Sequence, residues 1–99
     1  MKKKEKVEAY LNRVKPAHLS LIDADKYEVG DKEVEQIVRD CLEAGTDGIL
    51  VGGSKATVEQ LRFCLNAAHK IASKFRKPVI LFPHKHTDVL AIIEEVKNR

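Results

Sequence analysis

The stretch His18-Leu19-Ser20-Leu21-Ile22-Asp23 is apolar and extended and ends in an acid, which is the pattern of a buried strand. Two further apolar runs follow it, at Gly48 to Val51 and at Pro78 to Phe82. Strand ends therefore recur about every thirty residues, the length of a β-α-β unit. Strands that are apolar without alternation are typical of parallel sheets that helices cover on both faces. The sequence predicts an α/β fold built on a parallel sheet.

Segments with a helical spacing of apolar residues separate these runs. The first begins at the potential N-cap Asp31 and stops at Gly45, and its inward positions are Val34, Ile37, Val38, Cys41 and Leu42. The second begins with a capping box of Thr57 and Gln60, and its apolar stripe comprises Leu61, Cys64, Leu65, Ala68, Ile71, Ala72 and Phe75. A leader with the same spacing ends at Lys15-Pro16, and its apolar residues are Val7, Tyr10, Leu11 and Val14.

The C-terminal segment allows two interpretations. After a possible cap at Thr87, residues 88–97 have the spacing of a third helix, with Val89, Ile92, Ile93 and Val96 facing inward. The run from Val89 to Ile93 would also suit a fourth strand. We expect one domain over residues 1–99, with an N-terminal helix in residues 1–15 and βα units in residues 16–45, 46–77 and 78–99.

Composition narrows the class of protein. The chain has 99 residues, 43% of them hydrophobic and 33% charged, with a net charge of +3, as in an ordinary soluble globular protein. Clustered arginines with stacking aromatics are missing from the sequence, so we expect no nucleic-acid partner. Lysines rather than an apolar core follow Met1, and no apolar stretch is long enough to span a membrane, so we expect a cytoplasmic protein. Cys41 and Cys64 lack metal or CxxC spacing and are expected to be small buried hydrophobes.

Candidate site residues follow the strands. Right-handed crossovers place the carboxyl ends of parallel strands at one edge, where ligands of such folds bind. Asp23, Ser54 and residues 83–87 should share that edge. A carboxylate beside a hydroxyl is a hard-oxygen site suited to Mg²⁺, which takes few protein ligands together with substrate phosphates. The alternative for Asp23, and for Asp25, is that the carboxylate only caps its loop.

The Gly52-Gly53-Ser54 turn is the second candidate. Neither glycine has a Cβ, so the backbone could approach a ligand closely, and the helix that follows favours a phosphate at its N-terminus. A tight βα turn without a ligand explains the same residues. Lys26 could neutralise a phosphate or could be solvated.

The histidines are weaker candidates for a metal site. His84-Lys85-His86 lies on the expected edge, but two imidazoles without a third ligand more often belong to a loop than to a metal site. His18 and His69 have no partners that can be identified from the sequence.

Three of these segments resemble one family, the archaeal geranylgeranylglyceryl phosphate synthases. The segment from His18 to Lys26 is similar to their H-[LFV]-[ST]-L-I-D-P-D-K signature, and Glu43 to Ser54 is similar to their E-[AC]-G-T-D-[AG]-[IF]-[ML]-[VI]-G-G-S signature. Pro78 to Pro83 is similar to their P-[VI]-[IV]-L-F-P strand. Ala24 departs from the first signature, because it replaces a proline between the two acids.

The resemblance implies a fold, a reaction and a set of site residues. The fold would be a partial TIM-barrel-like sheet of three βα units after a short N-terminal helix. The family transfers a geranylgeranyl group from its diphosphate to the 3-hydroxyl of sn-glycerol 1-phosphate, with Mg²⁺. Asp23 and Ser54 would hold the metal, and Gly52, Gly53, Ser54 and Lys26 would bind the prenyl diphosphate.

The length argues against activity, since a full barrel needs about 200 residues or more. We therefore expect a truncated or engineered fragment of the prenyltransferase that is inactive alone. It could also be a structural barrel-fragment scaffold or a generic phosphate-binding α/β module. Exposed sheet edges predict self-association, or rearrangement into a small flavodoxin-like sheet.

Overall fold

A parallel sheet organises the protein, as the apolar runs predict. The structure is a computed structural model that describes residues 5–82. Its elements, in chain order, are α1 (Val7–Arg13), β1 (Leu19–Asp23), the 3₁₀ helix η1 (Ala24–Lys26), α2 (Glu33–Glu43), β2 (Gly48–Gly52), α3 (Val58–Ala72), the 3₁₀ helix η2 (Ser73–Phe75) and β3 (Val79–Phe82). The strands lie in the order β1-β2-β3, and both neighbouring pairs are parallel. The expected segment 88–97 and the histidines of residues 84–86 lie outside the described residues.

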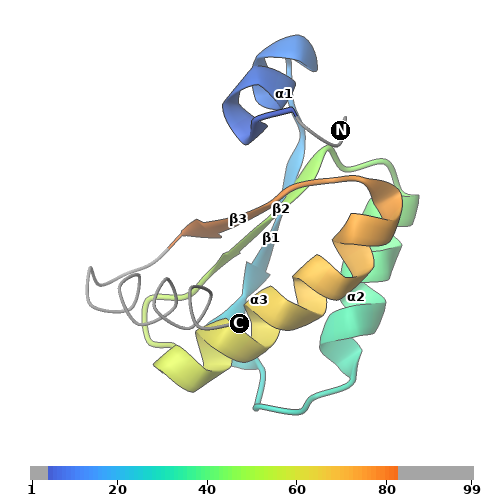
Figure 1. Ribbon diagram of the computed structural model, residues 1–99. Coiled ribbons are helices and arrows are strands. Elements are labelled where there is room, and N and C mark those ends of the chain that lie inside the picture. The colour runs from blue at the N-terminus through green and yellow to red at the C-terminus, as the bar shows by residue number, and fades with distance from the viewer. Residues whose placement is uncertain (1–4, 83–99) are drawn as a thin grey trace.

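Helices α2 and α3 pack side by side on one face of this sheet (Figure 1). Alternate strand residues enter the core between sheet and helices, and the buried ones are Ile22, Ile49 and Val51. The helices contribute the residues of the predicted stripes, among them Val34, Val38, Leu42, Leu61, Cys64, Ala68 and Ile71. The strand order does not reverse within residues 5–82, so the flavodoxin-like rearrangement, which needs a reversal, is wrong for this part of the chain.

Local signals place the helix ends. The left-handed backbone at Gly45, with φ of +100°, ends α2 as expected. Asp31 caps the start of α2 from one residue before the N-cap position, because its Oδ1 accepts a hydrogen bond of 2.9 Å from the Glu33 amide. The capping box of Thr57 and Gln60 at α3 is confirmed.

The opposite face of the sheet carries exposed apolar side chains. Leu21 is 62% exposed and Phe82 is 69% exposed. In the sheet register Leu21 pairs with Leu50, and Leu50 pairs with Ile80, so these residues form one row across the strands. The expectation that the strands are buried on both faces is wrong for residues 5–82. The physical reason is that an apolar run shows that the side chains of a strand favour burial. It does not show which element covers each face of the strand.

Hydrogen bonds fix the register of β1 and β2 at the amino-terminal edge of the sheet. The His18 amide donates to Asp47 Oδ2 over 2.8 Å, and the Asp47 amide donates to the His18 carbonyl over 2.7 Å. The Thr46 hydroxyl is buried, lies 3.0 Å from the His18 carbonyl oxygen and accepts a bond of 2.9 Å from Ser20 Oγ. Because a register shift by one residue would reverse every side chain, this network keeps Ile22 on the core side.

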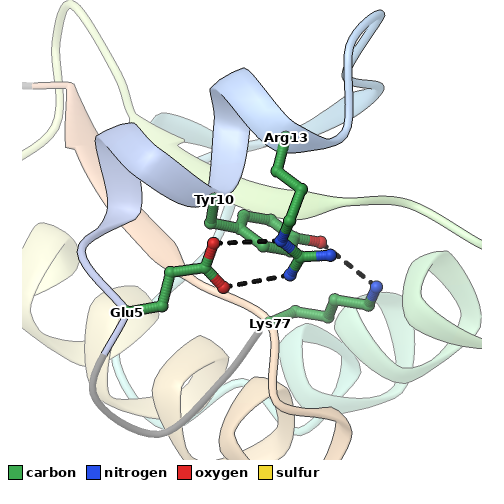
Figure 2. Close-up of polar contacts among 4 residues, drawn as sticks. All are labelled: Glu5, Tyr10, Arg13 and Lys77. Atoms are coloured by element: carbon green, nitrogen blue, oxygen red, sulfur yellow. Dashed lines mark hydrogen bonds and ion pairs between the residues drawn. The ribbon is translucent and has the colours of Figure 1, made fainter.

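Helix α1 lies at the same amino-terminal edge (Figure 1). Its Tyr10 is only 1% exposed, and its hydroxyl accepts a hydrogen bond of 3.2 Å from Lys77 Nζ, just before β3 (Figure 2). The Arg13 guanidinium lies 5.4 Å from the centre of the Tyr10 ring and donates two bonds, of 3.0 and 2.9 Å, to Glu5 (Figure 2). The buried ring thus anchors a helix of seven residues that is too short to be stable alone.

The helices of residues 5–82 include no candidate for a membrane span, because none of them is both long and apolar enough to cross a membrane.

Cys64 is a buried thiol whose chemistry can be tested. It is fully buried in α3, and burial raises its pKa to about 11, whereas Cys41 is only partly buried. We expect a thiol reagent at pH 8 to modify Cys64 only after unfolding, because the thiolate is the reactive form. The unfolded thiol loses its proton near pH 9 and the folded one near pH 11, so the neutral buried thiol stabilises the fold below pH 9 and this contribution is lost as pH rises to 11. Urea unfolding of wild type and Cys64→Ala at pH 8 and pH 10.5 checks this; an equal loss in both proteins would contradict it.

Candidate functional site

The expected site residues of β1 and β2 lie at the carboxyl edge of the sheet. Asp23 is the last residue of β1 and pairs in parallel register with Gly52, the last residue of β2. Ser54 follows Gly52 by two residues, and Phe82 at the end of β3 pairs with Gly52 on the other side. An acid and a hydroxyl therefore follow neighbouring strands at the same edge.

Asp23 both ends β1 and begins η1. Its side chain is half-buried, and its Oδ1 accepts a hydrogen bond of 3.1 Å from the Asp25 amide. This bond is the loop capping that the sequence offered as the alternative to metal binding. It uses one of the two carboxylate oxygens, and among the described residues no donor is bonded to Oδ2. Asp23 can therefore cap its own loop and still present an oxygen at the edge of the sheet.

Asp25 is bound to the next loop rather than to its own. Both of its carboxylate oxygens accept from the backbone amide of Lys55, each over 3.0 Å. Gly53 lies against the same carboxylate, so closely that a Cβ built on Gly53 would overlap Asp25 Oδ1. The loop after β1 is thus fastened directly to the loop after β2. Sequence reasoning missed this partnership, because a backbone amide leaves no signal in the pattern of residue types.

The two glycines are explained by these protein contacts. A Cβ on Gly52 would lie 2.6 Å from the carbonyl oxygen of Phe82, so a side chain there would push β3 away from β2. A Cβ on Gly53 would collide with Asp25. The close approach that both glycines allow is therefore an approach of neighbouring segments of the chain, and a ligand is not needed to account for either residue.

Ser54, Lys26 and the start of α3 complete the edge. Ser54 and Lys26 are exposed. Thr57 Oγ1 accepts a bond of 3.1 Å from the Gln60 amide, so one amide at the N-terminus of α3 already has a partner. Gln60 Nε2 donates to the Tyr27 carbonyl over 3.0 Å, which links the loop after β1 to the first turn of α3.

The residues at the edge fit a metal that is held mainly by its substrate. Within residues 5–82 there is no group of three or more His, Cys, Asp or Glu side chains that could hold a metal ion. Mg²⁺ does not need such a cage, because it commonly takes one or two carboxylates, water and substrate phosphates. The half-buried Asp23 carboxylate and the exposed Ser54 hydroxyl carry oxygen atoms of the chemical type that Mg²⁺ prefers.

The described histidines are not part of this site. His18 is exposed and lies at the amino-terminal edge, where its backbone pairs with Asp47. His69 is exposed on α3.

Comparison with known proteins finds the same family that the motifs resemble. Residues 10–96 match the PcrB family. The geranylgeranylglyceryl phosphate synthase of Methanopyrus kandleri is 39% identical over 75 residues, which cover 76% of this chain and 29% of that protein. The synthase of Methanothermobacter thermautotrophicus is 37% identical over 87 residues (85% and 34%), and that of Aeropyrum pernix is 43% identical over 72 residues (72% and 26%). The chain spans about a quarter to a third of the length of these curated relatives.

Proposed function

The chain belongs to the PcrB family, and from this premise we propose that it forms the metal and diphosphate half of a prenyltransferase site. The relatives bear the name geranylgeranylglyceryl phosphate synthase, so the proposed reaction is transfer of a geranylgeranyl group from its diphosphate to sn-glycerol 1-phosphate. One observation supports this most directly. Asp23 and Gly52 are register partners at the carboxyl edge of a parallel sheet, so Asp23 and Ser54 follow adjacent strands at one edge.

Each residue of this edge has a proposed role. Asp23 and Ser54 would hold Mg²⁺, and the Gly52-Gly53-Ser54 turn and Lys26 would bind the diphosphate. Bound Mg²⁺ supplies stabilisation of the negative charge that develops on a departing diphosphate. Lys26 is exposed in η1, next in sequence to Asp25, and its ammonium group would add positive charge at the same place.

We also propose that the chain does not complete the reaction alone. It spans at most 34% of the length of the relatives, and within residues 5–82 its sheet has three strands where a barrel has eight. The remaining strands would have to provide the glycerol phosphate site. With geranylgeranyl diphosphate, glycerol 1-phosphate and Mg²⁺ we therefore expect no product. Turnover that Asp23→Asn abolishes would overturn this part of the proposal.

Binding of Mg²⁺ and inorganic pyrophosphate tests the half-site directly. Titration calorimetry should show pyrophosphate binding that requires Mg²⁺, and Asp23→Asn should weaken it by more than about tenfold, because even second-shell losses cost 10–100-fold. Asp31→Asn is the matched control, since Asp31 caps α2 within its own loop. Equal affinity in wild type and Asp23→Asn would contradict the metal role. Pyrophosphate binding that needs no Mg²⁺ would instead favour a generic phosphate-binding module.

A second candidate, a self-associating scaffold, is favoured by the exposed sheet face. Leu21 and Phe82 are mostly exposed, and within residues 5–82 β1 and β3 each pair with a strand on one side only. Unpaired edges and apolar faces favour association with another copy. If this second candidate is correct, size-exclusion chromatography with light scattering should show an assembly larger than the 11.2 kDa chain. A monomer at high concentration would remove this candidate.

A further inference from the structure

The carboxylates of Asp23 and Asp25 are two residues apart, but they have different partners. Asp23 Oδ1 accepts one bond, from the Asp25 amide. Asp25 uses both of its oxygens on the Lys55 amide, across thirty positions of sequence. Within residues 5–82, the Asp23 carboxylate therefore accepts a bond from its own loop through one oxygen, whereas the Asp25 carboxylate accepts a bond from the loop after β2 through both oxygens.

These bonds form a continuous path between the two proposed metal ligands. The path begins at the Asp23 carboxylate, which the Asp25 amide holds over 3.1 Å. It continues through the Asp25 carboxylate to the Lys55 amide over 3.0 Å, and Lys55 is covalently joined to Ser54. Two hydrogen bonds that meet at Asp25 thus connect Asp23 to the residue that follows Ser54.

We infer that Asp25 is a positioning residue, which holds residues 53–57 against η1 and so places Ser54 beside Asp23, and that it is not itself a metal ligand. The inference rests on the proposed function for its consequence in binding, whereas the fastening of the loop is independent of it. Gly53 supports the inference from the other side, because the overlap of its hypothetical Cβ with Asp25 shows that the loop is packed directly on this carboxylate. A second bond, from Gln60 Nε2 to the Tyr27 carbonyl, holds the first turn of α3, which follows this loop, against the loop after β1.

Asp25→Ala, Asp25→Asn and the control Asp31→Ala test this role. In Asp25→Ala we expect amide hydrogen exchange of Lys55 and Ser54 to accelerate by about tenfold or more, while β2 amides stay protected and show that the sheet is folded. The affinity for Mg²⁺ with inorganic pyrophosphate should fall by about 10–100-fold, as for other residues that orient metal ligands. Asp25→Asn keeps one acceptor oxygen for Lys55 and should recover most of both losses. Asp31→Ala removes a carboxylate cap of the same kind from another loop and should change neither.

The exchange and affinity measurements on the Asp25 variants can each contradict the positioning role. Unchanged exchange at Lys55 in Asp25→Ala overturns it, and so does a loss of affinity in Asp25→Asn as large as in Asp25→Ala, since that pattern marks a charged ligand. If wild type binds no Mg²⁺ and pyrophosphate, the proposed function fails, and the exchange measurements still decide the positioning role. Gly53→Ala gives a further check. It should accelerate hydrogen exchange at Lys55 less in the Asp25→Ala background than in wild type, because the carboxylate with which the new Cβ collides has been removed there.

Discussion

Tyr10→Ala should lower the free energy of unfolding by about 3–5 kcal/mol, the range for truncation of a buried aromatic side chain. Tyr10 is 1% exposed and is the only buried residue of α1, so its ring is the apolar group of this helix that folding removes most completely from water. A helix of seven residues does not persist without such a contact. Chemical denaturation checks the change in stability, and hydrogen exchange should show α1 losing protection before the strands.

Two matched variants separate the ring from its polar contacts. Tyr10→Phe removes the bond from Lys77 Nζ and should cost only about 1 kcal/mol. Arg13→Ala removes an exposed ion pair with Glu5 and a ring contact, and should also cost about 1 kcal/mol or less. If Tyr10→Ala costs no more than Tyr10→Phe, α1 is not anchored by burial of the ring.

Ile22→Ala should lower the free energy of unfolding by about 2–5 kcal/mol, whereas Leu21→Ala should change it by about 0.5 kcal/mol or less. The two residues are adjacent in β1 and lose side chains of the same size, but Ile22 is 2% exposed in the core and Leu21 is 62% exposed on the opposite face. The pair therefore measures what each face of the sheet contacts. Urea unfolding at several protein concentrations gives both values and shows whether stability depends on assembly.

The Leu21 value also tests the self-associating scaffold. If another copy covers the exposed face in solution, Leu21→Ala should cost about as much as Ile22→Ala and should reduce the assembly size. Leu21→Lys then serves as a stronger version, because a charge on a covered face is costly to bury. A small Leu21 effect together with a monomer would show that the face is open to water.

The sequence predicted the edge of the sheet at which the candidate site residues lie, but not the contacts that those residues make. The end of each apolar run placed Asp23 and Ser54 on one edge, because parallel strands joined by right-handed crossovers point the same way. The same reasoning left open whether Asp25 capped its own loop. Its partner is the backbone N–H of Lys55, thirty residues later. Every residue type except proline has a backbone N–H, so no pattern of side chains could reveal the bond.

The sequence by itself determined the secondary structure and the strand directions. Helical periodicity, the Gly45 stop and the Thr57 capping box are local properties, and they predicted the α-helices of residues 5–82, but not the 3₁₀ helices η1 and η2. Tertiary structure alone decided which face of the sheet the helices cover, leaving Leu21 exposed and Ile22 buried, and why Gly52 and Gly53 must lack side chains. The physical reason is distance along the chain: capping and periodicity involve neighbours within a few residues, whereas burial and close packing depend on segments that meet only after folding.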